Sequence, residues 1–430
     1  MRDQTAWRIR HLGIGGRAEI TIIRFRKSEH RMNGLKRPKN GGGGGTVELD
    51  SRQREILRLL WRGGRMSRWE LHRQTGVNPN AVGVDVAALL NHGIVRECPS
   101  EIVGPGRPRI PLEIDPTIRY VVGLSISPGR VQASRLSLRG QLLGRTISRP
   151  TTDPTRAIAT AQSLLEESLS DKTLAIGLTV TGFVDPEKRS ILLSSSFTGH
   201  GGISLEPLYE MAGGLPVVLE NNMHALAAWW LLIHQAESDE DVLLVSIADG
   251  QMGAALLVEG RPNRGCATGA NELGHMRYFV ETETCYCGHP GCLERIVSTE
   301  FLRRRGVASG TLFEHAARFG TDVDGEPAAT KVMNEIIDYL STGLSNACNF
   351  IRPNRLVLSS EFTRYPAFVD ALQRAIRSRL LNELVKRVRI DQWDQVDSHS
   401  AETAGWLALA SLYREGWDRR PAQEEAAATT

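Results

Sequence analysis

The stretch "CYCGHPGCLE" (Cys285–Glu294) determines how the rest of this chain is interpreted. It holds three of the six cysteines within eight residues, in the spacing C-x-C-x4-C, and the glycines and proline among them favour tight turns. Soft thiolates that converge with one nitrogen ligand suit a tetrahedral zinc ion. Two histidines are candidates for the fourth ligand: His289 inside the loop, and His275 ten residues before Cys285 in "NELGHMRY".

We favour the distant histidine, because the close spacing of His289 to the cysteines makes it awkward for its ring to point inward with theirs. A site with three thiolates and one imidazole has no open position, so its zinc would be structural rather than catalytic. It would hold Glu272 and Glu294 in place. The alternative is that these are ordinary cysteines of a turn-rich loop. The expected zinc ligands are His275, Cys285, Cys287 and Cys292.

The composition is that of a soluble globular protein of two or three domains. The chain has 430 residues, of which 41% are hydrophobic and 23% charged. No apolar run approaches the roughly 18 residues that a membrane-spanning helix requires. Met1–Arg10 is charged and no signal-peptide core follows it. We therefore expect a cytoplasmic protein without a membrane partner, whose cysteines are reduced.

The charge of the chain is distributed unevenly. Residues 1–45 contain eleven Lys or Arg and three Asp or Glu, a net charge of +8, so the remainder of this +3 chain carries −5. A basic front suggests a polyanionic partner. Residues 1–48, which include the linker-like run Gly41–Gly45, are expected to be a disordered extension. A nucleic-acid-binding arm is the alternative for this segment.

Residues 49–114 have the pattern of a winged helix-turn-helix. Asp50 can cap a first helix, "SRWE" (Ser67–Glu70) has capping-box spacing for a second, and Asn78 with Pro79 can open a third. Two short strands, "IVREC" and "PLEI", then flank "GPGRPR". Helix, turn, helix and hairpin together indicate a DNA-binding domain, and a small helical interaction module is the alternative.

Several residues of this region are candidates for contact with DNA. The start of the third helix would meet bases, arginines around it would meet phosphates, and the Gly-Arg-Pro segment would enter an A·T-rich minor groove. Asp85 would repel phosphate unless it faces away from the DNA. The expected contacts are Asn78 and Asn80 for bases, Arg65, Arg68 and Arg73 for phosphates, and Arg107 with Arg109 in "PGRPR".

The rest of the chain alternates between strands and helices in two successive halves, 115–240 and 241–415, ahead of a disordered tail at 416–430. "YVVGLSIS", "VQASRLSL" and "QLLGRTI" are expected to form a strand meander, and "LPVVLEN" a strand that leads into the helix "NMHALAAWWLLIHQ". A long helix should cover roughly Ala329–Phe350. Two sheet-plus-helix halves predict a bilobed α/β unit with a cleft between its lobes.

At these residues the chain resembles the ROK family of repressors, open reading frames and sugar kinases. "GANELGHM" with "CYCGHPGCLE" is similar to the zinc signature of that family, with His275 matching the zinc histidine. "TVTGFVDP" (Thr179–Pro186) and "LPVVLENNMHA" (Leu215–Ala225) resemble the segments around its sugar site. The resemblance covers residues 49–415. It implies an actin-like, ribonuclease-H-like ATPase fold that binds sugar between its lobes, behind a winged helix-turn-helix as in the family's repressors.

The chain departs from the kinases of that family wherever they bind phosphate. The first phosphate loop is replaced by "GLSISPGR" (Gly123–Arg130), the second by "ADGQMGAA" (Ala248–Ala255), and a later Gly-Gly by "LSS" (Leu358–Ser360). Asn222 stands where the family has its catalytic aspartate. An amide cannot accept the proton of a sugar hydroxyl during phosphoryl transfer, so we expect no kinase activity.

The sugar-binding positions that the resemblance implies are partly retained. Ser196 replaces the usual asparagine of the sugar loop and His200 a neighbouring tryptophan, so the effector should differ from plain glucose or bind weakly. A structural carboxylate of the zinc loop is the alternative role for Glu272. The expected ligand-binding residues are Ser196, Asn221, Asn222, Glu272, His275 and Glu294.

Together these features predict a sugar-responsive transcriptional regulator of carbohydrate-metabolism genes, a repressor rather than an enzyme. It should bind a two-fold double-stranded DNA operator as a homodimer or homotetramer, with a sugar or sugar derivative as effector and zinc as a structural cofactor. A hexose kinase with a fused DNA-binding domain is one alternative. A ligand-independent DNA-binding or interaction protein with a vestigial cleft is the other. The sequence does not name the effector, the operator or the sign of regulation.

Overall fold

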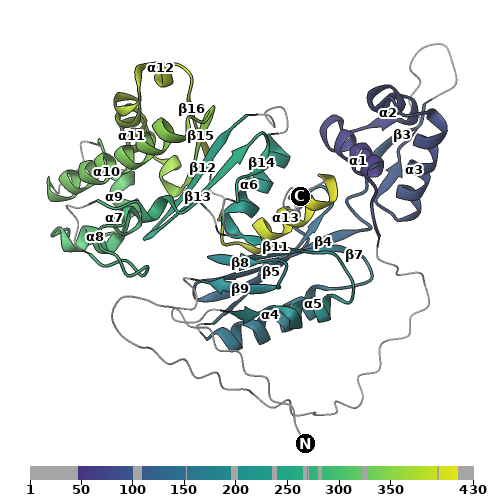
Figure 1. The fold of residues 1–430 in the computed structure, drawn as a ribbon, viewed down its shortest axis with the longest axis horizontal. Helices are drawn as coiled ribbons and strands as arrows, with labels where there is room; N and C mark the ends of the chain where they lie inside the picture. The colour runs from purple at the N-terminus through teal and green to yellow at the C-terminus, as the bar shows by residue number, and fades with distance from the viewer. Residues whose placement is uncertain are drawn as a thin grey trace, which may run out of the picture. The chain divides into compact units, whose positions relative to one another are not determined.

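The computed structural model in Figure 1 is described here for ten stretches of the chain. These are residues 47–99, 109–151, 153–194, 202–234, 240–264, 269, 271–278, 283–321, 327–394 and 397–414. Among these residues, no helix is both long enough and apolar enough to cross a membrane.

Three helices and a small antiparallel sheet of order β1-β3-β2 make up the described part of the N-terminal region, by which we mean residues 49–114. The three expected helix starts are confirmed, since Asp50, Ser67 and Asn78 each accept a hydrogen bond from a backbone N–H of the first turn. Pro79 occupies the first turn of the third helix, as expected. The elements are α1 (Ser51–Gly63), β1 (Met66–Ser67), α2 (Arg68–Thr75), α3 (Pro79–Asn91), β2 (Val95–Glu97) and β3 (Pro111–Ile114).

A first lobe is built on a five-stranded sheet of order β11-β7-β4-β5-β6, in which β4 pairs in parallel with β7 and antiparallel with β5. The expected third strand of the meander forms later than "QLLGRTI", at Ile147–Pro150, where it pairs with the start of β5. A separate three-stranded sheet has the order β10-β9-β8. The elements are β4 (Tyr120–Ser127), β5 (Arg130–Ser137), β6 (Ile147–Pro150), α4 (Pro154–Ser168), β7 (Thr173–Val180), β8 (Phe183–Asp185), β9 (Ser190–Leu193), β10 (Ile203–Ser204), α5 (Glu206–Ala212), β11 (Val217–Asn221) and α6 (Asn222–Ile233).

The last helix, α13 (Ala401–Tyr413), packs on this same sheet, against β4, β5 and β7, while α4 covers the opposite face (Figure 1). In the sequence analysis this helix falls within the second half of the chain, 241–415. The close approach of α13 to the first sheet depends on two glycines. A Cβ on Gly123 would lie 1.9 Å from the carbonyl oxygen of Ala401, and one on Gly177 would lie 1.8 Å from that of Ala404. Gly123 therefore serves helix packing.

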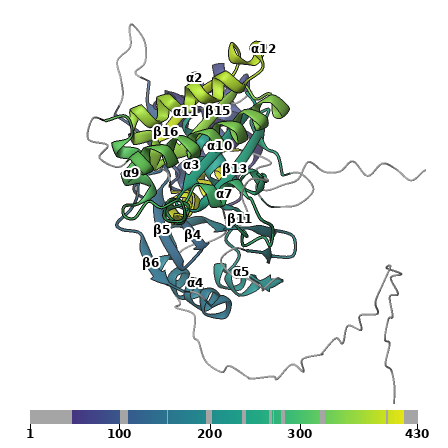
Figure 2. The same cartoon turned by 90° about the vertical axis from the view of Figure 1, so that its left-hand side faces the viewer.

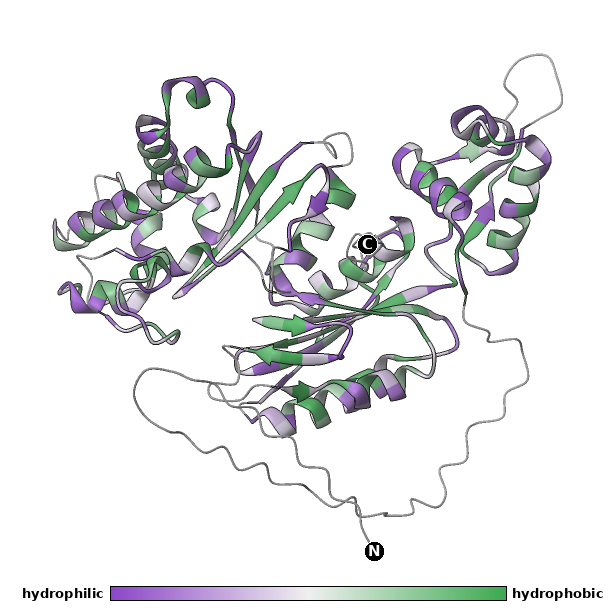
Figure 3. Cartoon of the chain, viewed as in Figure 1, coloured by the Kyte–Doolittle hydropathy of each residue, from purple (hydrophilic) through white to green (hydrophobic). Residues whose placement is uncertain are grey.

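A second lobe contains a five-stranded sheet of order β14-β13-β12-β15-β16, with helices on it (Figure 2). β12 and β13 form an antiparallel hairpin, and the expected long helix is confirmed as α10. Apolar residues concentrate in the strands (Figure 3). The elements are β12 (Val242–Ala248), β13 (Gln251–Val258), β14 (Arg261–Pro262), η2 (Leu273–His275), α7 (Leu293–Ile296), α8 (Thr299–Arg304), α9 (Leu312–Arg318), α10 (Pro327–Ile351), β15 (Arg355–Ser360), η3 (Glu361–Arg364), α11 (Pro366–Arg379), α12 (Asn382–Val385) and β16 (Arg389–Asp394).

Candidate functional site

Three cysteines and one histidine of the second lobe form a cluster that can hold a metal ion. The ligand atoms of His275, Cys285, Cys287 and Cys292 all lie within 4.8 Å of one another. The Sγ atoms of Cys287 and Cys292 are 3.5 Å apart, and Nδ1 of His275 is 3.7 Å from Sγ of Cys285. His289 is exposed and is not part of this cluster, and its carbonyl oxygen accepts a hydrogen bond from the backbone N–H of Cys285 at 2.9 Å.

The donor set and its spacing fit a zinc ion. Sulfur and nitrogen ligands placed tetrahedrally at about 2.0–2.3 Å from zinc lie roughly 3.5–3.8 Å from each other. Burial raises the pKa of Cys292 to about 12, so its thiolate form requires a cation close by. Burial also lowers the pKa of His275, which favours the neutral imidazole that a metal ligand must be. A bound zinc ion would have four protein ligands and would serve to fix their orientation.

The cluster points a second set of atoms into the cleft between the lobes. Nε2 of His275 lies 3.1 Å from the hydroxyl of Tyr286, 3.7 Å from a carboxylate oxygen of Glu272 and 3.8 Å from one of Glu294. Burial raises the pKa of Glu294 to about 7, against the opposing hydrogen bond from the backbone of Met252. The metal cluster therefore lies beside two carboxyl groups, those of Glu272 and Glu294, which flank the imidazole of His275. This arrangement is suited to binding hydroxyl groups.

The cleft itself has a volume of about 580 Å³ and draws its lining from both lobes. Pockets of this size bind small organic ligands, which are oriented by a few polar groups. Lining residues from the first lobe and from the segment before α13 include Thr181, Asn221, Asn222, Ser398 and His399. Those from the second lobe include Ser246, Gln251, Glu272, His275, Tyr286, Glu294 and Arg295.

Asn221 and Asn222 sit where β11 ends and α6 begins, and both are buried. The side chain of Asn221 is used locally, because its Nδ2 donates to the carbonyl oxygen of Gly182 at 2.6 Å and its Oδ1 caps the N–H of Met223 at 2.7 Å. Nδ2 of Asn222 donates to Oγ of Ser398 at 3.2 Å. Asn222 thus offers the cleft an amide that is held in place by a hydroxyl.

The corner of the cleft around Asn222 is closed by contacts from the segment before α13. Arg130, the first residue of β5, donates to Asp397 at 2.8 Å. Ser125 of β4 donates to the carbonyl oxygen of His399 at 2.8 Å. Pro128 lines this corner and has no N–H to offer. The ends of β4 and β5 are therefore attached to the segment before α13.

A buried charge network surrounds Glu220 of β11. Glu220 accepts hydrogen bonds from Nε of Arg264 at 2.7 Å and pairs with Nδ1 of His224 at 3.2 Å. Burial alone would raise the pKa of Glu220, but the bonds and charges of His224 and Arg264 outweigh it and hold that pKa below its usual range. Asn271 accepts from the N–H of Leu256 at 2.8 Å and so attaches the chain just before Glu272 to β13.

In the N-terminal region, the acidic residue of the third helix faces inward. Asp85 is 2% exposed, and its two carboxylate oxygens lie 3.2 Å and 3.1 Å from the guanidinium of Arg52 on α1. The exposed face of α3 carries Asn80, Val84 and Ala87 instead. Asp85 therefore does not lie on the exposed face of α3 and would not repel phosphate there.

The described arginines that were predicted to contact DNA fall into two groups. Arg65 pairs with Glu113 at 2.9 Å and Arg68 with Glu97 at 2.8 Å, so both have partners within the N-terminal region. Arg73 and Arg109 are exposed, and their guanidinium groups lie 5.1 Å and 4.3 Å from the ring centre of Trp69, which is 47% exposed. Asn78 is the cap of α3, accepting from the N–H of Asn80 at 2.9 Å. Arg107, Ser196 and His200 lie outside the described residues.

Two lobes with a five-stranded sheet in each, and a polar cleft between them, define an actin-like fold of the sugar-kinase type. The chain belongs to the ROK family, whose model matches residues 131–413, which confirms the resemblance expected from the metal motif.

Relatives of the chain include both repressors and kinases. The xylose repressor of Bacillus subtilis is 21% identical over 370 residues, which cover 84% of this chain and 94% of the repressor. A solved ROK family transcriptional regulator, a homologue of the Escherichia coli MLC protein, matches with a TM-score of 0.69 and 19% identity over 84% of this chain and 96% of that one. A ROK family glucokinase from Streptomyces griseus, solved with glucose and AMPPNP, matches with a TM-score of 0.54 and 21% identity over 67% of this chain and 99% of the glucokinase. At these identities the structural matches establish the fold.

Sequence reasoning missed several residues of the site. Tyr286 could have been found, since it lies between two predicted zinc ligands. Ser398 and His399 reach the cleft from a segment more than 170 residues away from Asn222, and no local pattern marks them. Trp69 carries no distinctive signal in the sequence, because tryptophan is ordinarily well buried.

Proposed function

We propose that this protein is a sugar-responsive, DNA-binding transcriptional repressor without sugar-kinase activity. The observation that carries the proposal is Asn222 at the position of the catalytic base, at the start of α6 and bound to Ser398 at 3.2 Å. An amide has no usable basicity, and here its nitrogen is already directed at a hydroxyl. The similarity to the xylose repressor over 84% of the chain supports the same function.

For DNA binding, we propose that residues 49–114 are a winged helix-turn-helix with α3 in the major groove. Its exposed face and the exposed arginines beside Trp69 support this role, because they present guanidinium groups and an indole ring at the surface. The residues proposed to contact DNA are Asn78, Asn80, Arg65, Arg68, Arg73, Arg107 and Arg109.

For the effector, we propose that a sugar binds in the cleft against Glu272, His275 and Glu294, with Asn221, Asn222 and Ser196 completing the site. A structural zinc ion on His275 and the three clustered cysteines would hold this wall of the cleft in place. Sugar binding would then change the relative position of two DNA-binding regions in a homodimer or homotetramer, and thereby the affinity for a two-fold operator.

The competing function is a hexose kinase, which the similarity to the glucokinase favours. Release of ADP from Mg·ATP in the presence of a hexose panel separates the two. We expect no turnover above a protein-free control for the wild type or for Asn222→Ala. Robust phosphorylation by the wild type that Asn222→Ala abolishes would refute the proposal. Zinc-replete protein should be used, so that an absence of turnover cannot be caused by the loss of zinc from the metal cluster.

A further inference from the structure

The exposed face of α3 carries no charged side chain. All 13 residues of this helix are described, and none of them is a lysine or an arginine. Its single acid, Asp85, is buried. In the major groove guanine is read most often by arginine or lysine, so this helix lacks the side chains that usually select guanine. The exposed residues of α3 are Pro79, Asn80, Val84, Ala87 and Asn91.

Val84 places a branched apolar side chain on that face. It is 67% exposed, whereas Val82 and Val86 on either side of it are buried in the core. Asn80 lies one helical turn before Val84, so the two side chains project from the same face of the helix. An asparagine amide pairs with the edge of adenine, and an apolar side chain packs against the 5-methyl group of thymine. The two residues are therefore suited to a sequence that contains A·T pairs.

Gly83 leaves open space beside Val84. It lies inside α3, where a glycine destabilises a helix relative to alanine. A Cβ added at this position would meet no atom within 4 Å, so no packing contact among the described residues requires the glycine. Glycine is also used where a backbone comes close to a ligand. The missing side chain thus suits a helix that lies against another molecule.

The charges next to α3 indicate that this other molecule is DNA. α2 packs against α3 and carries Trp69 and Arg73, which are both exposed. The guanidinium groups of Arg73 and Arg109 lie 5.1 Å and 4.3 Å from the centre of the Trp69 ring. An uncharged helix face with a cation on the neighbouring helix suits a duplex, because its phosphates border the base edges of the groove.

From these observations we propose that Val84 contacts the 5-methyl group of a thymine in each half of the operator, and that Gly83 admits this base pair to the surface of α3. The inference rests on the proposed function, because it requires α3 to bind in the major groove. Burial of one methyl group changes an equilibrium constant about fourfold. A two-fold operator makes the contact twice, so loss of both methyl groups should weaken binding about tenfold.

Deoxyuridine tests the contact, since it pairs as thymine does and lacks only the 5-methyl group. The full chain first selects a DNA fragment from a random pool, and each thymine is then replaced by deoxyuridine at both symmetry-related positions. We expect the wild type to lose about tenfold in affinity at one such pair of positions, as measured by fluorescence anisotropy. Val84→Ala no longer reaches the methyl group, so its two affinities at that pair should differ by less than about twofold.

Val258→Ala is the matched control for this titration. It makes the same exchange at a 38% exposed valine at the end of β13, and it should keep the wild-type loss. A wild type that binds every deoxyuridine fragment as tightly as the thymine parent would overturn this inference while leaving DNA binding intact. A Val84→Ala protein with the full wild-type loss at the same pair would overturn it too. If the full chain selects no DNA, the proposed function fails as well.

Gly83→Ala provides a second test, because it separates stability from binding. The added methyl group enters open space and alanine favours a helix, so the midpoint of chemical denaturation should stay the same or rise. The affinity for the selected fragment should nevertheless fall at least about fivefold, because the methyl group occupies the space that the base pair needs. Wild-type DNA affinity in a Gly83→Ala protein would contradict the close approach of α3 to the base pair.

Discussion

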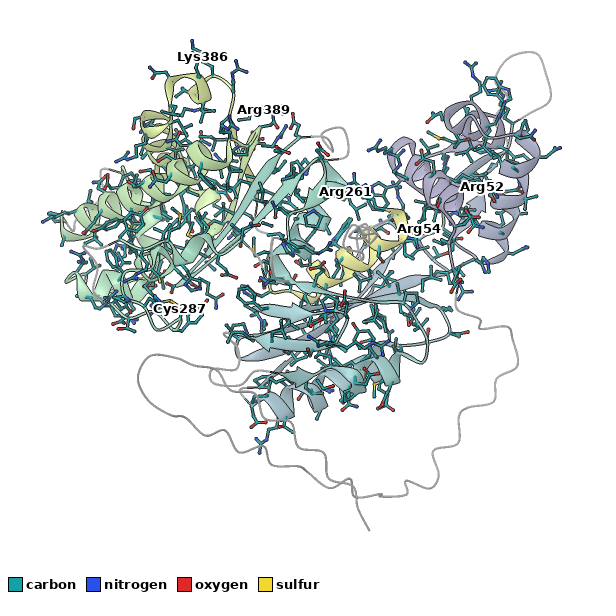
Figure 4. The ribbon with its side chains drawn as sticks, in the orientation of Figure 1. Arg52, Arg54, Arg261, Cys287, Lys386 and Arg389 are labelled. Carbon is teal, nitrogen blue, oxygen red and sulfur yellow. The ribbon has the colours of Figure 1, made fainter. Side chains whose placement is uncertain are left out.

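Trp61 joins the N-terminal region to the two helices that start in the cleft, and its replacement by alanine should uncouple them. Its Nε1 donates to the carbonyl oxygen of Leu232, near the end of α6, at 2.9 Å. Its ring lies 5.8 Å from that of Trp406 and 5.2 Å from that of Tyr413, both on α13. Arg54, labelled in Figure 4, adds a hydrogen bond from α1 to α13.

The size of the effect follows from these contacts. Two aromatic pairs contribute about 0.5–1.5 kcal/mol each, and the hydrogen bond contributes about the same. The guanidinium of Arg139, 5.0 Å above the ring of Trp61, adds about 0.5–1 kcal/mol. The anchor is therefore worth about 2–5 kcal/mol. Coupling between an effector and a second site is typically about 1–3 kcal/mol, so the loss is large enough to abolish it.

The assay compares DNA affinity with and without a bound sugar, by fluorescence anisotropy on a fragment selected by the wild type. Trp61→Ala should still bind both DNA and sugar, but the sugar should change its DNA affinity by less than about twofold. Ile233→Ala, which trims a 47% exposed side chain at the end of α6, is the control and should keep the full response. A Trp61→Ala protein with the same response as the control would refute this reasoning.

Three further outcomes can be measured. His275→Ala should lose the bound zinc that His289→Ala keeps, as measured by metal content, and loss only in the latter would reassign the ligand. Hydrogen bonds from two arginines hold the pKa of Glu113 at about 2, so its contribution to stability is complete above the unfolded value near 4.5 and is lost as the pH falls toward 2. Glu113→Gln should thus lower the denaturation midpoint at pH 7 and have little effect at pH 2, and an equal effect at both would contradict this. Gly177→Ala forces a Cβ against the carbonyl oxygen of Ala404, so it should cost about 1–3 kcal/mol in chemical denaturation; an unchanged midpoint would show that α13 can shift.

Local patterns predicted much of this fold because their causes are local. The caps at Asp50, Ser67 and Asn78 depend on residues within one helical turn, and all three form. The metal cluster was foreseeable for a related reason, since three of its four ligands lie within one tight loop and the fourth is ten residues away.

Contacts between distant segments were not foreseeable in the same way. The sequence does not reveal that α13 returns to the first sheet, because the signal consists of two glycines on separate strands, Gly123 and Gly177. Nor does it reveal that Ser398 meets Asn222, or that Arg295 is paired with Glu283. Each of these contacts depends on tertiary packing, and each bears on what the cleft can bind.

The central claim, that sugar in the cleft controls DNA binding, is tested most directly by one titration. The wild-type protein is bound to a DNA fragment that it selects from genomic DNA, and the sugar that binds it most tightly in a calorimetric panel is then added. The account predicts a change in DNA affinity of at least about fivefold, with no ADP formed when Mg·ATP is present. Saturating sugar that leaves DNA affinity unchanged while ATP is consumed would contradict it.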